Sequence, residues 1–121
     1  MSMATYRNKQ DDTIIRGSEF KLNISIDSKG EYHMSDVVFT CTFMCGGKSK
    51  TLTKLDMRAI YEEGKDYSDN YVAPLDTNDF GKGVLTVRYV ADIPDADFRT
   101  AGNADNKRHE IIDIKTKIKI V

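Results

Sequence analysis

A glycine-rich segment near the middle of the chain has residue types that could hold a phosphate. CGGKS, which begins at Cys45, is similar to the end of a phosphate-binding loop, where backbone amides and a lysine contact the phosphates. The first glycine of such a loop would fall at Thr42, and the residues TLTK that follow have strand character where a helix is needed. A β-turn between two strands is therefore the better interpretation.

A second segment, DTNDFGKG, resembles the beginning of an EF-hand calcium loop. Asp76 and Asn78 would occupy the first and third ligand positions. Phe80 occupies the fifth position, and Val87 occupies the twelfth, where a bidentate glutamate is required. A polar turn leading into a strand is favoured, and a weak calcium contact is kept as the alternative.

Two cysteines and two histidines supply the ligand types that zinc prefers. Cys41 and Cys45 are four residues apart in an alternating apolar run, which places them about 13 Å apart on a strand, too far for a disulfide or for one tetrahedral ion. His33 and His109 lie near expected strand ends and are interpreted as surface residues. We expect two buried free thiols in a protein made in a reducing cytoplasm, and no metal or other cofactor.

Catalytic combinations of residues are not indicated by local spacing. No Ser-His-Asp or Cys-His set is suggested, and the thiols lie in a core pattern rather than in an environment that lowers their pKa. Carboxylate pairs such as Asp95 and Asp97 lie in an expected loop, without the apolar enclosure that would raise one pKa for acid–base work. The sequence therefore predicts a protein that is not an enzyme.

The elements that carry these residues follow a period of two, which is typical of β-strands. In DVVFTCTFMC, for example, Val37, Phe39 and Cys41 share one face, and Val38 and Thr40 share the other. We expect about seven strands in an all-β, immunoglobulin-like antiparallel β-sandwich. The expected strands are residues 13–16, 20–26, 36–45, 49–54, 71–75, 83–91 and 109–121.

Two segments depart from this period. LDMRAIYEE, residues 55–63, has Met57, Ile60 and Tyr61 at helical spacing before Gly64, so one short helix there is an alternative to a loop. Residues 92–108 have no period and are rich in Asp, Asn, Gly and Ala, which predicts a long loop that could serve as a contact surface.

The ends of the chain add two further expectations. Residues 1–12 are predicted to be a flexible arm, interpreted either as a frayed terminus or as an arm that grips a neighbouring subunit. Residues 13–121 are predicted to form a single domain whose last strand runs to the end of the chain, so we expect no downstream module. Lysines at 115, 117 and 119 would line the outer face of that strand, where they prevent edge aggregation or contact an acidic partner.

Length and charge narrow the class of protein further. The 121 residues suffice for one hydrophobic core, and the formal net charge of −1 provides no overall field that would hold nucleic acid or a membrane surface. The polar N-terminus lacks the apolar run of a secretory signal, and no stretch approaches the length of a membrane span. We therefore expect neither a nucleic acid nor a membrane as partner.

The order of segments is that of a known group of domains. IIRGSEF comes first, DVVFTCTF follows, then DNYVAPLDT and GKGVLTVRY, and a final amphipathic strand comes after a loop rich in Asp and Asn. This order resembles the small immunoglobulin-like sandwich domains of tailed-phage virion proteins, among them the N-terminal domain of baseplate upper proteins. It is most similar to versions in phages of Bacteroides-type gut bacteria, including crAss-like phages.

The resemblance implies a non-enzymatic role in attaching, decorating or connecting parts of a virus particle. Because the chain ends where the domain ends, a capsid-bound auxiliary or head-fibre-anchoring protein is favoured over a tail or baseplate component. Its location would be the virion, its partners other virion proteins, and its state a homo-oligomer or many symmetric copies. The expected partner-binding residues are Tyr6, Arg7, Lys9, Asp97, Phe98 and Arg99.

A carbohydrate-binding or adhesin-like module is the alternative, because sandwich domains often carry sugar sites on their loops. Sugar platforms use exposed aromatic side chains. The chain has no Trp, but Tyr67, Tyr71 and Phe98 lie in expected loops or at strand ends.

Overall fold

Eight β-strands make up the part of the chain that the computed structural model describes, which is residues 13–98 and 107–121. The strands are β1 (Thr13–Ile14), β2 (Glu19–Ser25), β3 (Val38–Cys45), β4 (Lys48–Thr53), β5 (Arg58–Ala59), β6 (Asn70–Asp76), β7 (Gly83–Pro94) and β8 (Lys107–Ile120). Four single-turn 3-10 helices connect them: η1 (Met34–Asp36), η2 (Lys54–Asp56), η3 (Thr77–Asp79) and η4 (Ala96–Phe98). All seven expected strands are present, which confirms the all-β prediction.

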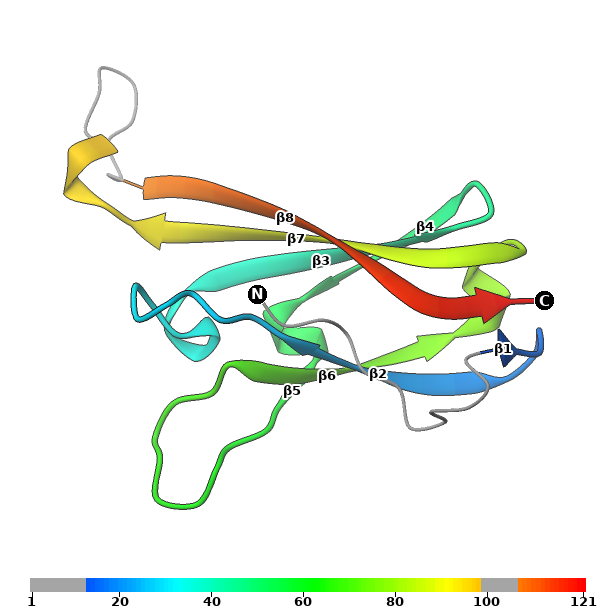
Figure 1. The fold of residues 1–121 in the computed structure, drawn as a ribbon, viewed down its shortest axis with the longest axis horizontal. Helices are drawn as coiled ribbons and strands as arrows, with labels where there is room; N and C mark the ends of the chain where they lie inside the picture. Colours follow the sequence, from blue (N-terminus) through cyan, green and yellow to red (C-terminus); the bar gives the residue numbers. More distant parts are fainter. Residues whose placement is uncertain (1–12, 99–106) are drawn as a thin grey trace.

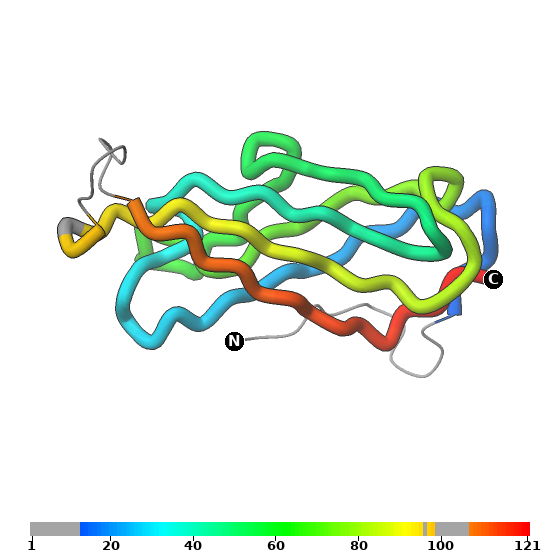
Figure 2. The backbone as a smooth tube through the Cα atoms, turned by 90° about the horizontal axis from the view of Figure 1, so that it is seen from above, coloured from blue at the N-terminus to red at the C-terminus, as the bar shows by residue number. Residues whose placement is uncertain are grey.

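The strands form two layers that pack face to face (Figure 1). One sheet has the order β1-β8-β7-β3-β4, and the other has the order β2-β6-β5. This is the strand order of an immunoglobulin-like sandwich in which β4 is added beside β3, as in variable-type domains. The view from above shows that the long strands of both layers run along the long axis of the molecule (Figure 2).

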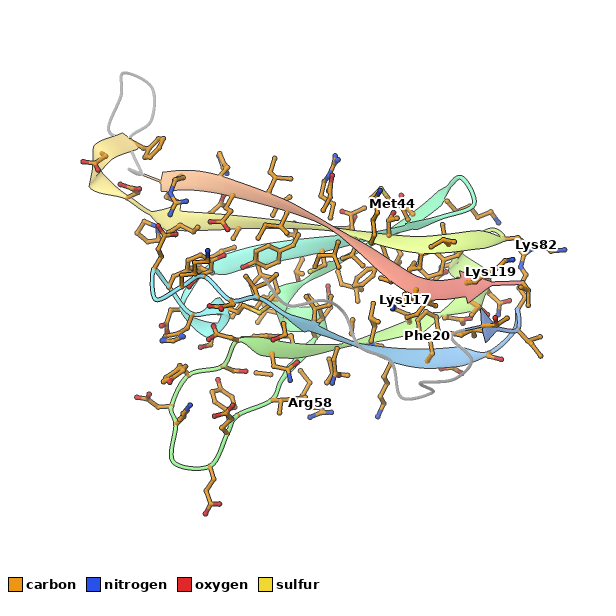
Figure 3. All side chains as sticks on the ribbon, in the orientation of Figure 1. Phe20, Met44, Arg58, Lys82, Lys117 and Lys119 are labelled. Atoms are coloured by element: carbon orange, nitrogen blue, oxygen red, sulfur yellow. The ribbon has the colours of Figure 1, made fainter. Side chains whose placement is uncertain are left out.

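The core lies between the layers and follows the period seen in the sequence. β3 turns Phe39, Cys41, Phe43 and Cys45 inward, and β7 buries every second residue in the same way. Figure 3 shows Met44 and Arg58 on the outer sides of the two opposite layers. Each large apolar side chain buried in this way contributes about 1.5–3 kcal/mol to the free energy of folding.

The two thiols behave as the sequence predicts. Cys41 and Cys45 are free and buried. Burial disfavours the thiolate and raises the pKa of Cys41 to about 12. Burial also raises the pKa of Cys45. Its thiol donates a hydrogen bond to the Gly81 carbonyl oxygen, with Sγ and O 3.2 Å apart. Neither thiol is therefore a nucleophile at neutral pH.

The short helix considered for residues 55–63 is absent. Residues 54–56 form η2, whose Asp56 carboxylate accepts hydrogen bonds from the Thr53 amide at 2.8 Å and the Thr53 hydroxyl at 3.0 Å. The chain then pairs Arg58 with Val72 and Ala59 with Tyr71 as strand β5. Pairing with β6 satisfies backbone groups that a helix would have to satisfy alone, so tertiary structure overrides the helical spacing.

Two other expectations need correction. The five-stranded sheet is mixed rather than antiparallel, because β1 pairs with β8 in parallel through Thr13–Lys119 and Ile14–Ile120. The irregular segment expected at residues 92–108 is shorter, because the β7–β8 ladder continues to the pair Pro94–Lys107. The ladder extends because cross-strand hydrogen bonds are made by the backbone and form whatever the side chains are. Polar side chains in this part of the ladder obscure the alternation that would have predicted a strand from the sequence.

Both glycine-rich segments form turns, as predicted, and they meet at one end of the sandwich. Gly46 and Gly47 have φ values of +60° and +80° and close the β3–β4 hairpin. The Gly81 amide donates to the Cys45 carbonyl oxygen at 3.0 Å. A Cβ atom on Gly46 would lie 2.4 Å from the Gly81 carbonyl carbon, so the two backbones are in direct contact. We call residues 45–47 and 76–83 the turn end; Figure 3 shows Lys82 there.

Candidate functional site

Three connections meet at the opposite end of the sandwich, which we call the loop end (Figure 1). It comprises residues 26–37 between β2 and β3, residues 60–69 between β5 and β6, and the adjoining ends of β7 and β8. Chain segments distant in sequence are thus brought together by the sandwich topology, as in other domains of this architecture.

Arg108 joins two parts of the loop end. Its guanidinium contacts Asp95 and Glu110 on the β7–β8 hairpin, each at 3.2 Å, and Glu31 of the β2–β3 connection at 3.6 Å. One cation therefore bridges three carboxylates, and it holds the hairpin against the 26–37 segment.

A pocket of about 270 Å³ lies at the loop end, lined by Ser25, His33 and side chains of residues 60–70. The His33 ring stacks on the Tyr67 ring with centroids 3.7 Å apart and an angle of 22° between the planes. Its Nδ1 lies 2.9 Å from Asp69 Oδ2, and Asp69 Oδ1 accepts a hydrogen bond from the Met34 amide at 2.9 Å. These contacts fix the orientation of a histidine side chain that is 37% exposed.

A second pair of charges lines the same pocket. Lys65 Nζ lies 2.8 Å from Glu62 Oε2 and 5.6 Å from the centroid of the Tyr67 ring. The hydrogen bond to Glu62 raises the pKa of Lys65, which keeps the ammonium group charged. Lys65 and Glu62 pair with each other, and the Asp69 carboxylate is held by the His33 ring and the Met34 amide, so each of these groups has a partner within the protein.

Ser68 and Asn70 form the polar base of the pocket. Ser68 is buried, and its Oγ accepts a hydrogen bond from the Asn70 amide at 3.1 Å. The same Oγ lies within hydrogen-bond distance of the carbonyl oxygens of Ile60 and Asn70. Asn70 Oδ1 is buried, and within residues 13–98 and 107–121 it has no hydrogen-bond partner.

The outer face of the five-stranded sheet is a second candidate surface, formed by the outward residues of β4, β3, β7 and β8. Val38 and Ile111 are 63% and 61% exposed, and Ile111 lies opposite Val90 in the ladder. In the next row, Arg88 forms a two-point ion pair with Asp113 at 2.8 and 3.0 Å. Threonines fill much of the remainder on β3, β4 and β7: Thr40, Thr42, Thr51, Thr53 and Thr86. On β8 the outward row continues beyond Asp113 with the exposed lysines predicted from the sequence, at 115, 117 and 119. We call this surface the outer face.

The predicted partner-binding residues are described only in part. Tyr6, Arg7, Lys9 and Arg99 lie outside the described residues. Asp97 and Phe98 belong to η4 at the tip of the β7–β8 hairpin, where the Asp97 amide donates to Asp95 Oδ1 at 3.1 Å.

The three aromatic residues considered for a sugar platform differ in their exposure to solvent. Phe98 is 44% exposed. Tyr67 lines the pocket, but Tyr71 is buried in β6 and packs edge-on against Phe39, so it cannot serve as a platform.

The residues considered for zinc are not brought together. His109 pairs with Asp92 at 2.5 Å, His33 pairs with Asp69, and the two thiols lie in the core. No cluster of three or more metal-binding side chains occurs in the described segments. The same segments contain no helix long and apolar enough to cross a membrane.

Sequence reasoning assigned His33 to the ordinary surface and so missed the pocket. His33 is 36 positions away from Asp69, its partner in the pocket, so no local pattern connects the two residues. The available signal was local: DYSDN, residues 66–70, concentrates an aromatic ring, two carboxylates, a hydroxyl and an amide just before a strand.

Comparisons with known proteins give little guidance. No family model matches the chain, and no curated protein matches it. Among solved structures, the chain is similar to a Bacteroides vulgatus protein described as a "putative glycoside hydrolase", with 19% sequence identity and a TM-score of 0.36. The likeness covers 92% of this chain but 16% of that one, so the chain spans about a sixth of that protein's length. A TM-score of this size carries no inference about activity.

Proposed function

We propose that this chain is a non-enzymatic structural protein of a bacteriophage virion, associated with the capsid as an auxiliary or head-fibre-anchoring protein, and that it binds other virion proteins through its outer face. The observation that carries the proposal is the composition of that face. Val38, Val90 and Ile111 form an apolar group, which is bordered by threonines and by the Arg88–Asp113 ion pair, with the exposed lysines of β8 beyond that pair.

Such a surface has the features of the centre of a protein–protein interface. Interface centres are depleted of unpaired charge and enriched in side chains that can be desolvated at low cost. Arg88 and Asp113 already pair with each other, so covering them leaves neither ion without a partner. β-branched side chains also lose little rotamer entropy when a partner covers them. The partner surface that fits is apolar at its centre and carries acidic groups where it meets the exposed lysines of β8.

The setting in a virus particle rests on the resemblance of the segment order to virion sandwich domains. A structural role also agrees with the chemistry of the two thiols, which burial keeps protonated. A tail or baseplate component would use the same kind of contact and is the alternative location.

The test is co-purification with virus particles, followed by binding of the purified chain to isolated capsid protein. Ile111→Asp places an unpaired charge in the centre of the outer face, and we expect it to weaken binding at least about tenfold. Leu55→Asp is the matched control, because Leu55 is 94% exposed in η2 and lies off the outer face.

Absence of the chain from particles would overturn the virion assignment. Binding that survives Ile111→Asp but is lost in Leu55→Asp would move the contact to another surface. Association with tails rather than heads would select the alternative location.

A further inference from the structure

The two ends of the sandwich carry charge of opposite sign. The loop end contains eleven Asp and Glu side chains against four Lys and Arg side chains, counted over the described residues 26–37, 60–69, 92–98 and 107–110. The turn end has the opposite balance, with six Lys and Arg side chains against three Asp and Glu side chains once its adjoining segments are included, which are residues 16–19, 48–50 and 117–121. The formal net charge of −1 therefore conceals a separation of charge along the molecule.

The cations of the turn end form no ion pair within the described parts of the chain. They are the exposed side chains of Arg16, Lys48, Lys50, Lys82, Lys117 and Lys119. The ion pairs of these parts lie at the loop end or, for Arg88 and Asp113, in the middle of the outer face. Figure 3 shows Lys82 and Lys119 together at the turn end. These positive charges are therefore available to a partner.

The carboxylates of the loop end outnumber the cations that could neutralise them. Arg108 and Lys65 already pair with carboxylates of the same end. Exposed carboxylates without an ion pair in the described residues remain in all parts of this end: Asp27, Asp36, Glu63, Asp66 and Asp97. The surface therefore stays negative around the pocket and at the tip of the β7–β8 hairpin.

The charged ends lie too far apart to neutralise each other within one copy. They are at opposite ends of the long axis of the molecule (Figure 2). β7 alone has 12 residues and spans about 40 Å at roughly 3.3 Å per residue. Charges in water interact weakly beyond a Debye length of about 10 Å at 0.1 M salt. Each end therefore attracts an oppositely charged surface outside its own copy.

A second copy of the chain is the partner that fits both ends. A polyanion such as DNA would match the turn end and be repelled by the loop end, and a cationic partner would match the loop end alone. Another copy offers both surfaces at once, and its net charge of −1 adds almost no overall repulsion. Because the two surfaces differ, the contact is heterologous and can repeat from copy to copy.

We propose that the negatively charged loop end of one copy binds the positively charged turn end of the next, so that copies of this chain associate head to tail. The contact shares Lys117 and Lys119 with the outer face and leaves the apolar group of that face free. It therefore does not depend on the binding of other proteins through the outer face.

Sedimentation velocity of the whole chain at low and high salt, about 20 mM and about 300 mM NaCl, tests the proposal. Single exposed ion pairs are weak, so we expect a dissociation constant on the order of 0.1–1 mM at low salt. The weight-average mass should rise with protein concentration beyond that of two copies. The dissociation constant should increase at least about tenfold at high salt, because screening weakens contacts between exposed charges.

Charge reversal distinguishes the two ends. Lys48→Glu with Lys82→Glu alters the turn end, and Glu63→Lys with Asp66→Lys alters the loop end. Each double variant should bind to itself at least about tenfold more weakly than the unaltered chain does. An equimolar mixture of the two should regain association and stop at one copy of each. The unaltered loop end of the first variant fits the unaltered turn end of the second, whereas their altered ends repel each other.

Lys21→Glu with Arg58→Glu is the matched control, because it makes the same change in net charge away from both ends. The two side chains are exposed and line one shallow pocket on the outer side of the three-stranded layer. The control should change the dissociation constant less than about threefold. The variants at the ends should still bind capsid protein through the apolar group of the outer face, so failure of one proposal leaves the other standing.

Four outcomes would overturn head-to-tail association. The first is a mass that stays at one copy at low salt and millimolar concentration. The second is association that salt and the end variants leave unchanged, which would indicate an apolar contact. The third is a mass that levels off at two copies, which would indicate a side-by-side antiparallel dimer. The fourth is that a short DNA duplex binds the turn end while the copies stay separate, which would assign the cations to a polyanion.

Discussion

The two ends of this sandwich are closed in different ways. At the turn end, backbone packs directly on backbone, and Gly46 and Gly81 leave no room for a side chain. At the loop end, side chains such as His33, Tyr67 and Asp69 make the contacts between segments and leave a pocket. The groups in a backbone contact are the same for every residue type, whereas the groups in a side-chain network change with each substitution. We therefore expect the turn end, more than the loop end, to determine stability.

The largest expected effect is at the turn end. Gly46→Ala adds a Cβ atom at positive φ and 2.4 Å from the Gly81 backbone, so we expect a loss of about 3 kcal/mol in the free energy of unfolding. Gly47→Ala is the matched control, because Gly47 also has positive φ but nothing lies within 4 Å of its Cβ position. It should cost about 1–2 kcal/mol. Urea unfolding of the two variants measures the difference, and equal losses would show that the close contact is unimportant.

The next effect is also at the turn end. Thr77 is fully buried, and its hydroxyl accepts from the Gly17 amide at 2.7 Å and donates to the Ser18 carbonyl oxygen at 2.8 Å. Thr77→Val keeps the shape but leaves the Gly17 amide unpaired, whereas the Ser18 carbonyl oxygen still accepts from the Thr77 amide at 3.1 Å, so we expect a cost of about 2 kcal/mol. Thr42→Val, on the outer face, should have almost no effect on unfolding in urea. A comparable loss in both variants would contradict the comparison of the two ends.

Alkaline pH probes the core between the two ends. The pKa of Cys41 is raised from its ordinary value of 9.0 to about 12, so the unfolded chain releases this proton at lower pH than the folded chain. The contribution of the protonated thiol to the free energy of unfolding is complete below pH 9 and is lost as the pH rises from 9 to 12. The loss is roughly 1.4 kcal/mol at pH 10. Melting curves across this range should show the decline.

Cys41→Ala should reduce that decline between pH 9 and 10, even though it lowers stability at neutral pH; the raised pKa of Cys45 should leave a smaller part of the decline in place. Burial also raises the pKa of Tyr89, so some alkaline instability should remain above pH 10 in the alanine variant. An unchanged slope below pH 10 would show that the Cys41 thiol is not the group that titrates.

The smallest expected effect is at the loop end. Asp69→Asn keeps the acceptor for the Met34 amide and removes the charge that faces His33, so we expect a loss below about 1 kcal/mol. Asp66→Asn, an exposed change in the same segment, is the control and should have no effect in the same unfolding measurement. A loss in Asp69→Asn as large as that of Gly46→Ala would show that the loop end also determines stability.

The fold class could be predicted because the inward residues of the long strands are almost all apolar. The alternation in β2, β3, β7 and β8 gives their buried faces directly, and paired glycines mark the β3–β4 turn. Strand β5 could not be predicted, because its two residues are a strand only through pairing with β6. The parallel contact of β1 with β8 was hidden for the same reason, since it joins the two ends of the described chain.

By itself, the sequence determined the layered architecture and the burial of both thiols, because side-chain alternation is a local property of each strand. Only the tertiary structure decided which polar residues meet. His33 reaches Tyr67 and Asp69, Arg108 reaches Glu31, and Gly46 touches Gly81 across separations that carry no local signal. The physical reason is that the core depends on the average hydrophobicity of a face, whereas a site depends on individual atoms from distant segments, which the packing of the sheets brings within a few ångströms of one another.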